Sequence, residues 1–184
     1  MLTDNRGEGT LLSIMNGAIK ALASYVPERL VTNEELARSV DTSDEWIRSH
    51  TGIAERRLAS DDVAASDLGI RAARKLLDRE KIDPDTIDLV IGATSTPDYA
   101  PFPATACIIQ DRLGCSRAGA FDLQAGCTGF VYALEVAASM IASGSTRRVL
   151  VVAAEKLSSL TNWNDRGTCV LFGDGAGAVL LEPA

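Results

Sequence analysis

The chain has 184 residues, a length that suits one domain. Apolar residues make up 46% and charged residues 23%, so the chain can bury a sizeable core and lacks the composition of a disordered protein. The formal net charge of −7 argues against nucleic acid or an anionic membrane as partner. No apolar run approaches the roughly 20 residues of a membrane span, and the mixed charges of Met1–Gly9 are unlike a secretory signal. We therefore expect a cytoplasmic protein.

The first credible core segment begins after Met15, so we expect either that residues 1–15 are a disordered extension or that Met15 is an alternative start, and that residues 16–184 form the domain. The four cysteines form no CxxC pair and there is a single histidine, which makes a metal site unexpected. A protein of this size and apolar content needs no disulfides, so we expect reduced thiols.

The first part of the chain predicts strands and helices with recognisable boundaries. Its helix signals are capping residues and a spacing of four between apolar residues. The expected elements are a strand at 18–26, a short helix capped by Thr32 or Asn33 and ending at Ser39, a second short helix capped at Thr42–Ser43 and stopped by Gly52, a longer helix beginning at Asp61 or Asp62, and a buried strand at 88–94.

The second part continues the alternation. We expect a helix at 104–113, a strand at 118–123, a long helix after Gly129 with Phe130, Leu134, Ala138 and Ile141 on one face, a strand at 148–154, a tight turn at Gly173–Gly177 and a last strand at 178–182. Alternating strands and helices favour an α/β layered fold with a mainly parallel sheet flanked by helices.

Cys127 has the most suggestive position of the four cysteines. It lies between a predicted strand and a predicted helix, with Gly126 and Gly129 beside it. A thiol at a helix N-terminus sits at the positive end of the macrodipole, which favours the nucleophilic thiolate. Core packing at the helix start is the plain alternative. The nucleophile elbow of α/β hydrolases is a local rival, although the usual residue between the first glycine and the nucleophile is missing.

Trp46 lies on a short predicted helix and has two interpretations. It packs the core, or it offers a flat surface to an adenine ring. In the second interpretation, basic side chains near Trp46, together with Arg166, would contact the phosphates of the nucleotide. Each arginine alone is more often a solvated surface charge. The candidates are Arg48, His50, Arg56, Arg57 and Arg166. The block Gly173–Gly177 fails the spacing of a dinucleotide-binding loop.

Several separate motifs, in order from about Met15 to the end, resemble one family of thiolase-fold condensing enzymes, the beta-ketoacyl-acyl-carrier-protein synthases III. They are Asp41–Ile47, Thr51–Ile53, Thr94–Tyr99, Phe102–Ala106, Phe121–Phe130, Asp165–Thr168 and Phe172–Ala178. The resemblance implies a thiolase-like layered fold, of which this chain is the N-terminal half.

The resemblance also implies roles for individual residues. Cys127 would take an acyl group, usually acetyl, from acyl-coenzyme A, which is a substrate, and no cofactor is implied. Trp46 would stack on the adenine and Arg166 would help clamp the coenzyme. Phe172 would line the acyl pocket, and Phe102 would reach the neighbouring subunit's pocket in a homodimer. The enzyme would then condense the acyl group with malonyl-acyl-carrier protein, which starts a fatty-acid chain.

Two features depart from the family pattern. His50 stands where an arginine that contacts the coenzyme is common, and Arg48 is the expected substitute. The family consists of two similar halves, and its catalytic histidine and asparagine lie in the second, so we expect this span alone to be incomplete for condensation. A truncated relative that binds acyl-coenzyme A without condensing remains an alternative, and a cysteine hydrolase is a third.

Overall fold

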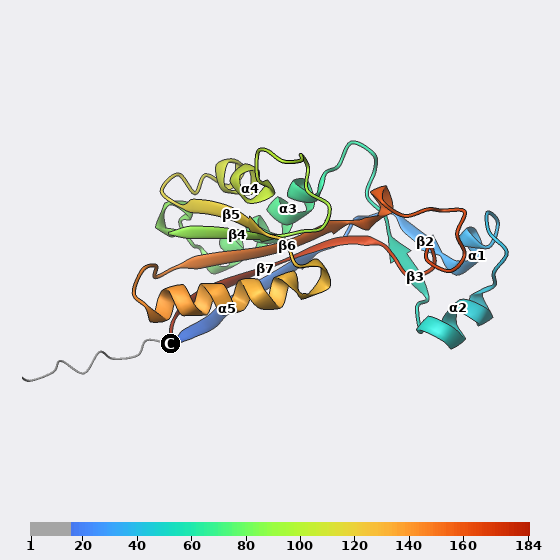
Figure 1. The fold of residues 1–184 in the computed structure, drawn as a ribbon, viewed down its shortest axis with the longest axis horizontal. Helices are drawn as coiled ribbons and strands as arrows, with labels where there is room; N and C mark the ends of the chain where they lie inside the picture. Colours follow the sequence, from blue (N-terminus) through green and yellow to red (C-terminus); the bar gives the residue numbers. More distant parts are fainter. Residues whose placement is uncertain (1–15) are drawn as a thin grey trace, which may run out of the picture.

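The computed structural model describes residues 16–184, so the extension expected at 1–15 lies outside the described residues. A five-stranded sheet carries helices on both faces, and a smaller lobe extends from one end of it (Figure 1). The elements of the sheet body are β1 (Gly17–Tyr25), α3 (Ala65–Glu80), β4 (Leu89–Ala93), α4 (Thr105–Leu113), β5 (Gly119–Leu123), α5 (Gly129–Ala142), β6 (Val149–Lys156) and β7 (Asp174–Pro183). The lobe contains β2 (Leu30–Thr32), α1 (Asn33–Leu36), α2 (Asp44–Thr51) and β3 (Glu55–Arg57). Short 3-10 turns are η1 (Pro84–Thr86), η2 (Gly126–Thr128) and η3 (Leu157–Ser159).

The strand order in the large sheet is β1-β7-β6-β4-β5. β4 pairs in parallel with both β5 and β6, whereas β7 pairs antiparallel with both β6 and β1. β1, β6, β4 and β5 therefore run in one direction and β7 alone runs against them. This arrangement confirms the α/β layered class with a mainly parallel sheet. β7 reverses because the segment between β6 and β7 contains only the turn η3 and no crossover helix.

The two faces of the sheet bury alternate residues of the same strands. Val90, Leu150 and Val152 pack with α3 and α4 on one face. Ile91, Val149 and Val151 pack with α5 on the other face. Successive side chains of a strand point to opposite faces, and burial of each large aliphatic side chain stabilises the fold by roughly 1.5–3 kcal/mol. The continuous apolar runs in β4 and β6 are explained by these two helical layers.

Two helices of the body begin where distant carboxylates bind their first N–H groups. Asp98 accepts a hydrogen bond from the Ser66 backbone N–H at 2.9 Å, at the start of α3. Asp122 accepts bonds from the N–H groups of Thr105 and Ala106, both at 2.7 Å, at the start of α4. A carboxylate is stabilising at this end of a helix. The prediction that α3 begins at Asp61 or Asp62 was therefore wrong, because Asp98 fixes its start from a later segment.

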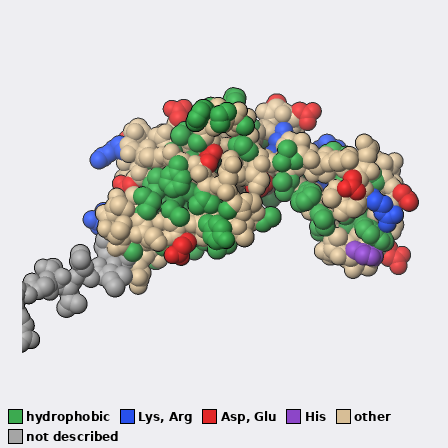
Figure 2. All heavy atoms as spheres, in the orientation of Figure 1, with side chains coloured by type: hydrophobic (Ala, Val, Ile, Leu, Met, Phe, Trp, Pro, Cys, Tyr) green, Lys and Arg blue, Asp and Glu red, His purple; other side chains and the backbone are tan. Residues whose placement is uncertain are grey.

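The long helix α5 turns a different face inward from the one we expected. Ala133, Ala137 and Ile141 are fully buried, while Phe130, Leu134 and Ala138 are only partly buried against the same cluster. On the outer side, Val131 and Tyr132 are 60% and 54% exposed. Hydrophobic side chains also gather on the face of the molecule seen in Figure 2. The helix is apolar nearly all round, so sequence periodicity alone identified its buried face poorly.

The lobe contains the two strands that the sequence did not predict. β2 and β3 have three residues each and pair antiparallel, with α1 and α2 between them in the chain. α1 begins at Asn33 with Thr32 as its cap, as expected, but ends at Leu36 rather than Ser39. α2 has the predicted cap at Ser43 and the predicted stop at Gly52, whose φ of 74° is left-handed. Leu36, Ile47, Cys169 and Val170 form the small core of this lobe.

The glycine-rich block is part of a strand rather than a tight turn. Asp174–Gly177 belongs to β7 and pairs with β6, and its last two residues, Ala176 and Gly177, also pair with β1. The expected crowding is present at Gly173, where an added Cβ would lie 3.1 Å from the Arg57 carbonyl oxygen. At Gly175 and Gly177 an added Cβ would meet its nearest atoms at 3.5 and 3.9 Å, so the crowding is confined to Gly173.

Candidate functional site

The carboxyl ends of β4 and β5 form a natural crevice. The two strands are parallel neighbours, yet the helix after β4 covers one face of the sheet and the helix after β5 covers the other. The connections leaving the two strands therefore diverge, and ligands in α/β sheets bind at such switch points. A cavity of about 670 Å3 opens here. It is lined from the segment after β4 by Ser95, Pro97, Tyr99, Ala100, Pro101, Phe102 and Ala104, and from β5 and its end by Asp122 and Gln124.

Cys127 lies in η2, between the end of β5 and the start of α5, as the sequence predicted. Gly126 before it has a φ of 55°, a left-handed conformation that glycine adopts without strain. The Thr128 hydroxyl donates a hydrogen bond to the Ala125 carbonyl oxygen at 2.8 Å, which tightens the same turn. The thiol of Cys127 is exposed at this edge of the sheet.

The other three cysteines have different surroundings. Cys115 and Cys169 are completely buried, and burial raises the pKa of Cys115 to about 11 and also raises the pKa of Cys169. Cys107 is partly buried on α4, where its thiol contacts the Ala120 carbonyl oxygen at 3.8 Å. Because the thiolate is the nucleophile, Cys127 is the cysteine best placed to react with a substrate from solvent.

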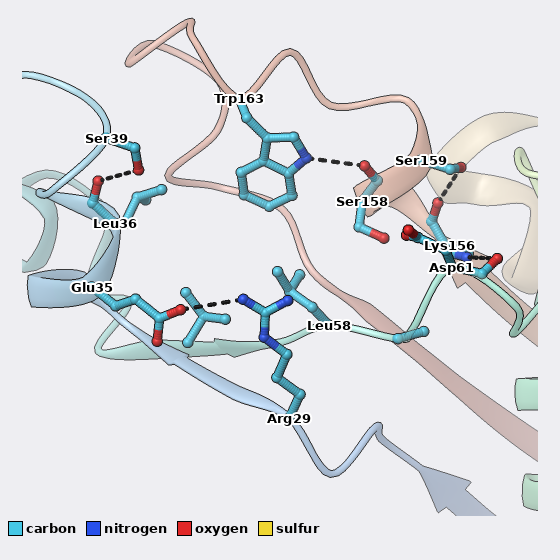
Figure 3. A pocket seen from close by; sticks show the side chains of 12 residues that line it. Arg29, Glu35, Leu36, Ser39, Leu58, Asp61, Lys156, Ser158, Ser159 and Trp163 are labelled. Atoms are coloured by element: carbon cyan, nitrogen blue, oxygen red, sulfur yellow. Dashed lines mark hydrogen bonds and ion pairs between the residues drawn. The ribbon is translucent and has the colours of Figure 1, made fainter.

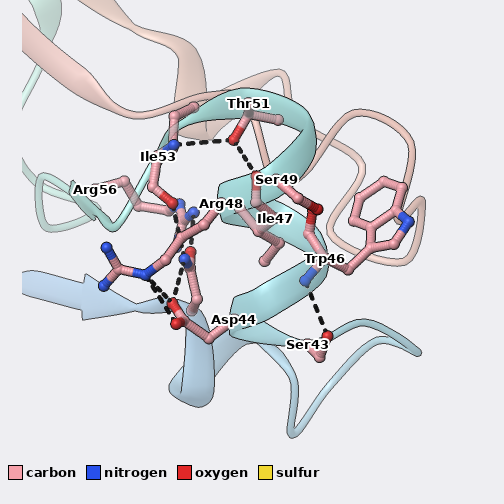
Figure 4. Close-up of polar contacts among 10 residues, drawn as sticks. Ser43, Asp44, Trp46, Ile47, Arg48, Ser49, Thr51, Ile53 and Arg56 are labelled. Carbon is pink, nitrogen blue, oxygen red and sulfur yellow. Dashed lines mark hydrogen bonds and ion pairs between the residues drawn. The ribbon is translucent and has the colours of Figure 1, made fainter.

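Trp46 lies on α2, and its backbone is well fixed. Its N–H donates to the Ser43 hydroxyl oxygen at 3.1 Å, and the next residue, Ile47, is completely buried (Figure 4). The indole itself is only partly buried beside the lobe core. Trp46 thus packs against the lobe core and still exposes part of its side chain, so core packing and adenine stacking are both compatible with its position.

The structure brings Trp46, His50 and Arg166 together. The His50 ring stacks on the Trp46 ring with a centroid separation of 4.3 Å and an interplanar angle of 22°. The Arg166 guanidinium carbon lies 4.8 Å from the Trp46 ring centroid, within the range of a cation–π contact. Arg166 also approaches Asp41 at 3.6 Å. Residues that are 120 positions apart in the sequence thus meet at one surface.

Arg48 does not join this stack. Its Nε lies 2.8 Å from both carboxylate oxygens of Asp44, one helical turn earlier (Figure 4). Asp44 in turn accepts a bond from Asn33 at 2.8 Å, and Asn33 accepts one from the buried Arg56 at 2.8 Å. Arg56 is 5% exposed and links β3 to Val31 on β2 and to Asn33, so its role is structural. Arg57 donates to the Glu28 carbonyl oxygen at 3.0 Å.

The two phenylalanines occupy different surroundings. Phe102 is 82% exposed and lines the cavity after β4. Phe172 is partly buried just before β7, next to the buried Val170 region of the lobe core. The side chain of Phe102 is therefore free to meet another surface.

A second cavity, of about 500 Å3, was not foreseen from the sequence (Figure 3). Trp163 donates from Nε1 to the Ser158 carbonyl oxygen at 3.2 Å, and Arg29 pairs with Glu35 at 3.2 Å. The lining comes from three separate segments, so no local sequence pattern identifies the cavity: Arg29, Val31, Glu35, Leu36, Ser39, Leu58, Ala59, Asp61, Lys156, Ser158, Ser159 and Trp163.

Within residues 16–184, no group of three or more histidine, cysteine, aspartate or glutamate side chains is arranged to hold a metal ion. None of the helices in that same part of the chain has the length and apolar character needed to cross a membrane.

Comparison with known proteins identifies one family. The family model for 3-oxoacyl-[acyl-carrier-protein] synthase III matches residues 121–184. Beta-ketoacyl-[acyl-carrier-protein] synthase III of Desulfitobacterium hafniense is 51% identical over 90% of this chain and 50% of its own length. The enzyme of the same name from Roseiflexus sp. is 58% identical over 86% of this chain and 48% of its own length. The chain thus spans about half the length of these relatives.

Solved structures give the same result. The 3-oxoacyl-[acyl-carrier-protein] synthase III of Aquifex aeolicus matches with a TM-score of 0.88 and 46% identity, over 91% of this chain and 54% of that one. The corresponding protein of Pseudomonas aeruginosa matches with a TM-score of 0.86 and 42% identity, over 92% of this chain and 51% of that one. The resemblance to this family and the thiolase-like fold expected from the motifs are confirmed.

Proposed function

We propose that this chain, which matches the beta-ketoacyl-acyl-carrier-protein synthase III family along about nine tenths of its length, is the nucleophile-bearing half of a condensing acyltransferase. The observation that carries the proposal is the exposed thiol of Cys127, at the start of α5 and beside the β4–β5 crevice. The donor is acyl-coenzyme A, most simply acetyl-coenzyme A, and the acceptor is malonyl-acyl-carrier protein.

The first half-reaction uses Cys127. Its thiolate attacks the thioester carbonyl carbon of the donor, a new carbon–sulfur bond forms, and coenzyme A leaves as a thiolate that takes up a proton. Cys127 lies in the turn η2, immediately before α5. Backbone N–H groups of the same turn are suited to stabilise the developing oxyanion. In the second half-reaction, malonyl-acyl-carrier protein loses carbon dioxide and its carbanion attacks the Cys127 thioester, which releases the thiolate.

The coenzyme portion of the donor is proposed to bind at Trp46 and Arg166. A flat adenine ring gains stacking energy from the indole and from the guanidinium plane. In the unliganded chain the guanidinium already lies 4.8 Å from the indole centroid, so the two groups are positioned to enclose a ring after a small outward shift of Arg166. The charge of Arg166 then also serves the phosphates.

The acyl group and a partner subunit are proposed to meet at the crevice. β5 has β4 as its one neighbour in the described sheet, so its other edge offers unpaired backbone groups. Phe121 on that strand is 36% exposed and Phe102 nearby is 82% exposed. Pairing of two copies along β5 would cover both, which supports a homodimer in which Phe102 reaches the partner's acyl pocket and Phe172 lines its own. Sedimentation of the protein at micromolar concentration tests this, because an active monomer contradicts it.

Condensation is proposed to need residues outside this span. Stabilising the malonyl-derived carbanion is assigned in this family to histidine and asparagine donors, and such electrostatic terms contribute several kcal/mol. The one histidine of the 184 residues, His50, is stacked on Trp46. The position of His50 on Trp46, away from Cys127 in the sequence, also favours the second candidate, a relative that binds acyl-coenzyme A without condensing. Supplying residues 1–184 with acetyl-coenzyme A and malonyl-acyl-carrier protein tests the point, and formation of beta-ketoacyl product would overturn it.

The role of Cys127 is tested by substitution. Cys127→Ala should abolish transfer of acetyl groups from acetyl-coenzyme A to the protein, while Cys107→Ala, a change at a partly buried cysteine, should leave transfer intact. Thermal unfolding of both variants serves as the control, because Cys127 is exposed and its loss should not destabilise the fold. Full acyl transfer in the Cys127→Ala variant would exclude the proposed mechanism.

A further inference from the structure

His50 is held against Trp46 by two kinds of contact. Its Nδ1 lies 2.8 Å from the Trp46 carbonyl oxygen, and its ring stacks on the indole of the same residue at 4.3 Å. A carbonyl oxygen only accepts, so Nδ1 carries the hydrogen and donates it. The spacing of four residues on α2 places the two rings on the same side of the helix. Backbone and side chain of Trp46 are thus both tied to one imidazole.

The two neighbours of the Trp46 indole differ in how firmly they are fixed. Arg166 comes from a separate loop, and among residues 16–184 its charge pairs with the fully exposed Asp41 alone, at 3.6 Å. An exposed ion pair of this kind contributes little, so Arg166 is free to move away from the ring. His50 is fixed within the helix by its hydrogen bond. The indole therefore has one movable neighbour and one fixed neighbour.

We propose that His50 is a positioning residue that holds the Trp46 indole in the orientation that receives the base of an adenine nucleotide. The inference rests on the proposed function, since it assumes that Trp46 stacks on the coenzyme. His50 acts through Trp46 and does not contact the phosphates. Arg48 does not replace it, because Arg48 is engaged by Asp44. His50 therefore supports recognition of the flat base by Trp46. It contributes equally to the binding of nucleotides with and without a 3′-phosphate.

Two ligands separate this role from a phosphate contact. Coenzyme A carries a 3′-phosphate, and dephospho-coenzyme A lacks it. By calorimetry on the purified protein, His50→Ala should weaken binding of both ligands by a similar factor of about 3- to 10-fold, the range expected for one aromatic stacking contact. His50→Phe keeps a flat ring against the indole but loses the Nδ1 hydrogen bond, so its loss of affinity for both ligands should be smaller than that of His50→Ala. Weakening confined to coenzyme A, or an equal loss in His50→Phe and His50→Ala, would overturn the proposal in favour of a phosphate contact.

A second readout does not depend on ligand binding. The chain has two tryptophans, so Trp163→Phe leaves Trp46 as the single indole fluorophore. In that background His50→Ala should increase the rapid motion of the indole in a time-resolved anisotropy decay, and His50→Phe, which keeps the stacked ring but not the hydrogen bond, should give an intermediate motion. Unchanged motion in His50→Ala would contradict the positioning role.

Trp46→Leu separates this inference from the proposed function. If Trp46→Leu leaves binding of both coenzymes unchanged, the proposed coenzyme site itself is wrong. If Trp46→Leu weakens both and His50→Ala weakens neither, the coenzyme site stands and the role of His50 is refuted.

Discussion

The sheet body and the lobe are stabilised in different ways. In the body, every residue of β4 is buried, and two large apolar clusters pack on the two faces of the sheet. In the lobe, four buried apolar or thiol-bearing residues form the core, and the buried polar pair Arg56 and Asn33 ties the pieces together. The body carries Cys127 at one edge, whereas the lobe carries Trp46.

The sheet body and the lobe are proposed to serve two separate tasks, which are attack by the nucleophile and binding of the coenzyme. The nucleophile lies next to a layered sheet whose packing resists distortion. The proposed coenzyme surface lies on short elements connected by side-chain hydrogen bonds, which are more easily adjusted. Mutations in the body should therefore affect the whole molecule, and mutations in the lobe should affect binding first.

The largest effect is expected from truncation in the body. Ile91 on β4 is completely buried against α5, and Ile91→Ala should lower the free energy of unfolding by about 2–5 kcal/mol through lost burial and a cavity. Urea denaturation gives the value. Because Ile91 belongs to the main core, the whole urea unfolding transition should move to lower urea concentration. A loss of unfolding free energy under about 1 kcal/mol would mean that the layer around β4 is not the main core.

A smaller and more local effect is expected from Arg56→Met in the lobe. The change removes the bonds from Arg56 to the Asn33 side chain at 2.8 Å and to the carbonyl oxygens of Val31 and Val170. It also removes a buried charge, which offsets part of the loss. Unfolding free energy should fall by about 1–2 kcal/mol. Coenzyme A binding should weaken while alkylation of Cys127 by iodoacetamide keeps its rate.

Arg38→Met is the matched control for this change, because Arg38 lies in the same lobe with an exposed side chain. It should leave both stability and coenzyme binding unaltered. If Arg56→Met changes the alkylation rate of Cys127 as much as it changes coenzyme binding, the body and the lobe are not separable in function.

The smallest effect concerns the pH dependence of the lobe. The hydrogen bond from Asn33, followed by that from Arg48, lowers the pKa of Asp44 below its ordinary value. A carboxyl whose pKa is depressed on folding stabilises the protein at pH values above its unfolded pKa, and this contribution is lost as the pH falls through the folded value. Asp44→Asn should therefore reduce stability at pH 7, and the difference from the unchanged protein should shrink below about pH 4.

Urea midpoints at pH 7 and pH 3.5 measure this dependence. Glu45→Gln, at an exposed neighbouring position on α2, is the control and should show no such convergence. A constant difference between Asp44→Asn and the unchanged protein across this range would show that the carboxylate charge is not what anchors α2.

Local patterns predicted the elements whose signals lie within a few residues. The cap at Ser43, the stop at Gly52, the buried run of β4 and the turn at Cys127 are of this kind. The start of α3 was mispredicted because Asp98, 32 residues after Ser66, provides the contact. The lobe strands β2 and β3, of three residues each, are too short for an alternation of apolar and polar residues to be recognised.

The candidate site divides in the same way. Cys127 was found from its place between a strand and a helix, whereas Trp46 and Arg166 were linked through family motifs alone. Their contact joins segments 120 positions apart, and no local pattern encodes it. The stack of His50 on Trp46 did have a local signal, since two flat side chains four residues apart on a helix are neighbours.

The most direct test of the account is the site of acylation. The protein is incubated with acetyl-coenzyme A, digested, and its peptides are mapped by mass spectrometry. We predict an acetyl thioester on Cys127, the exposed thiol at the start of α5. Acetyl groups on Cys107, Cys115 or Cys169, with none on Cys127, would contradict the assignment of the nucleophile and the function built on it.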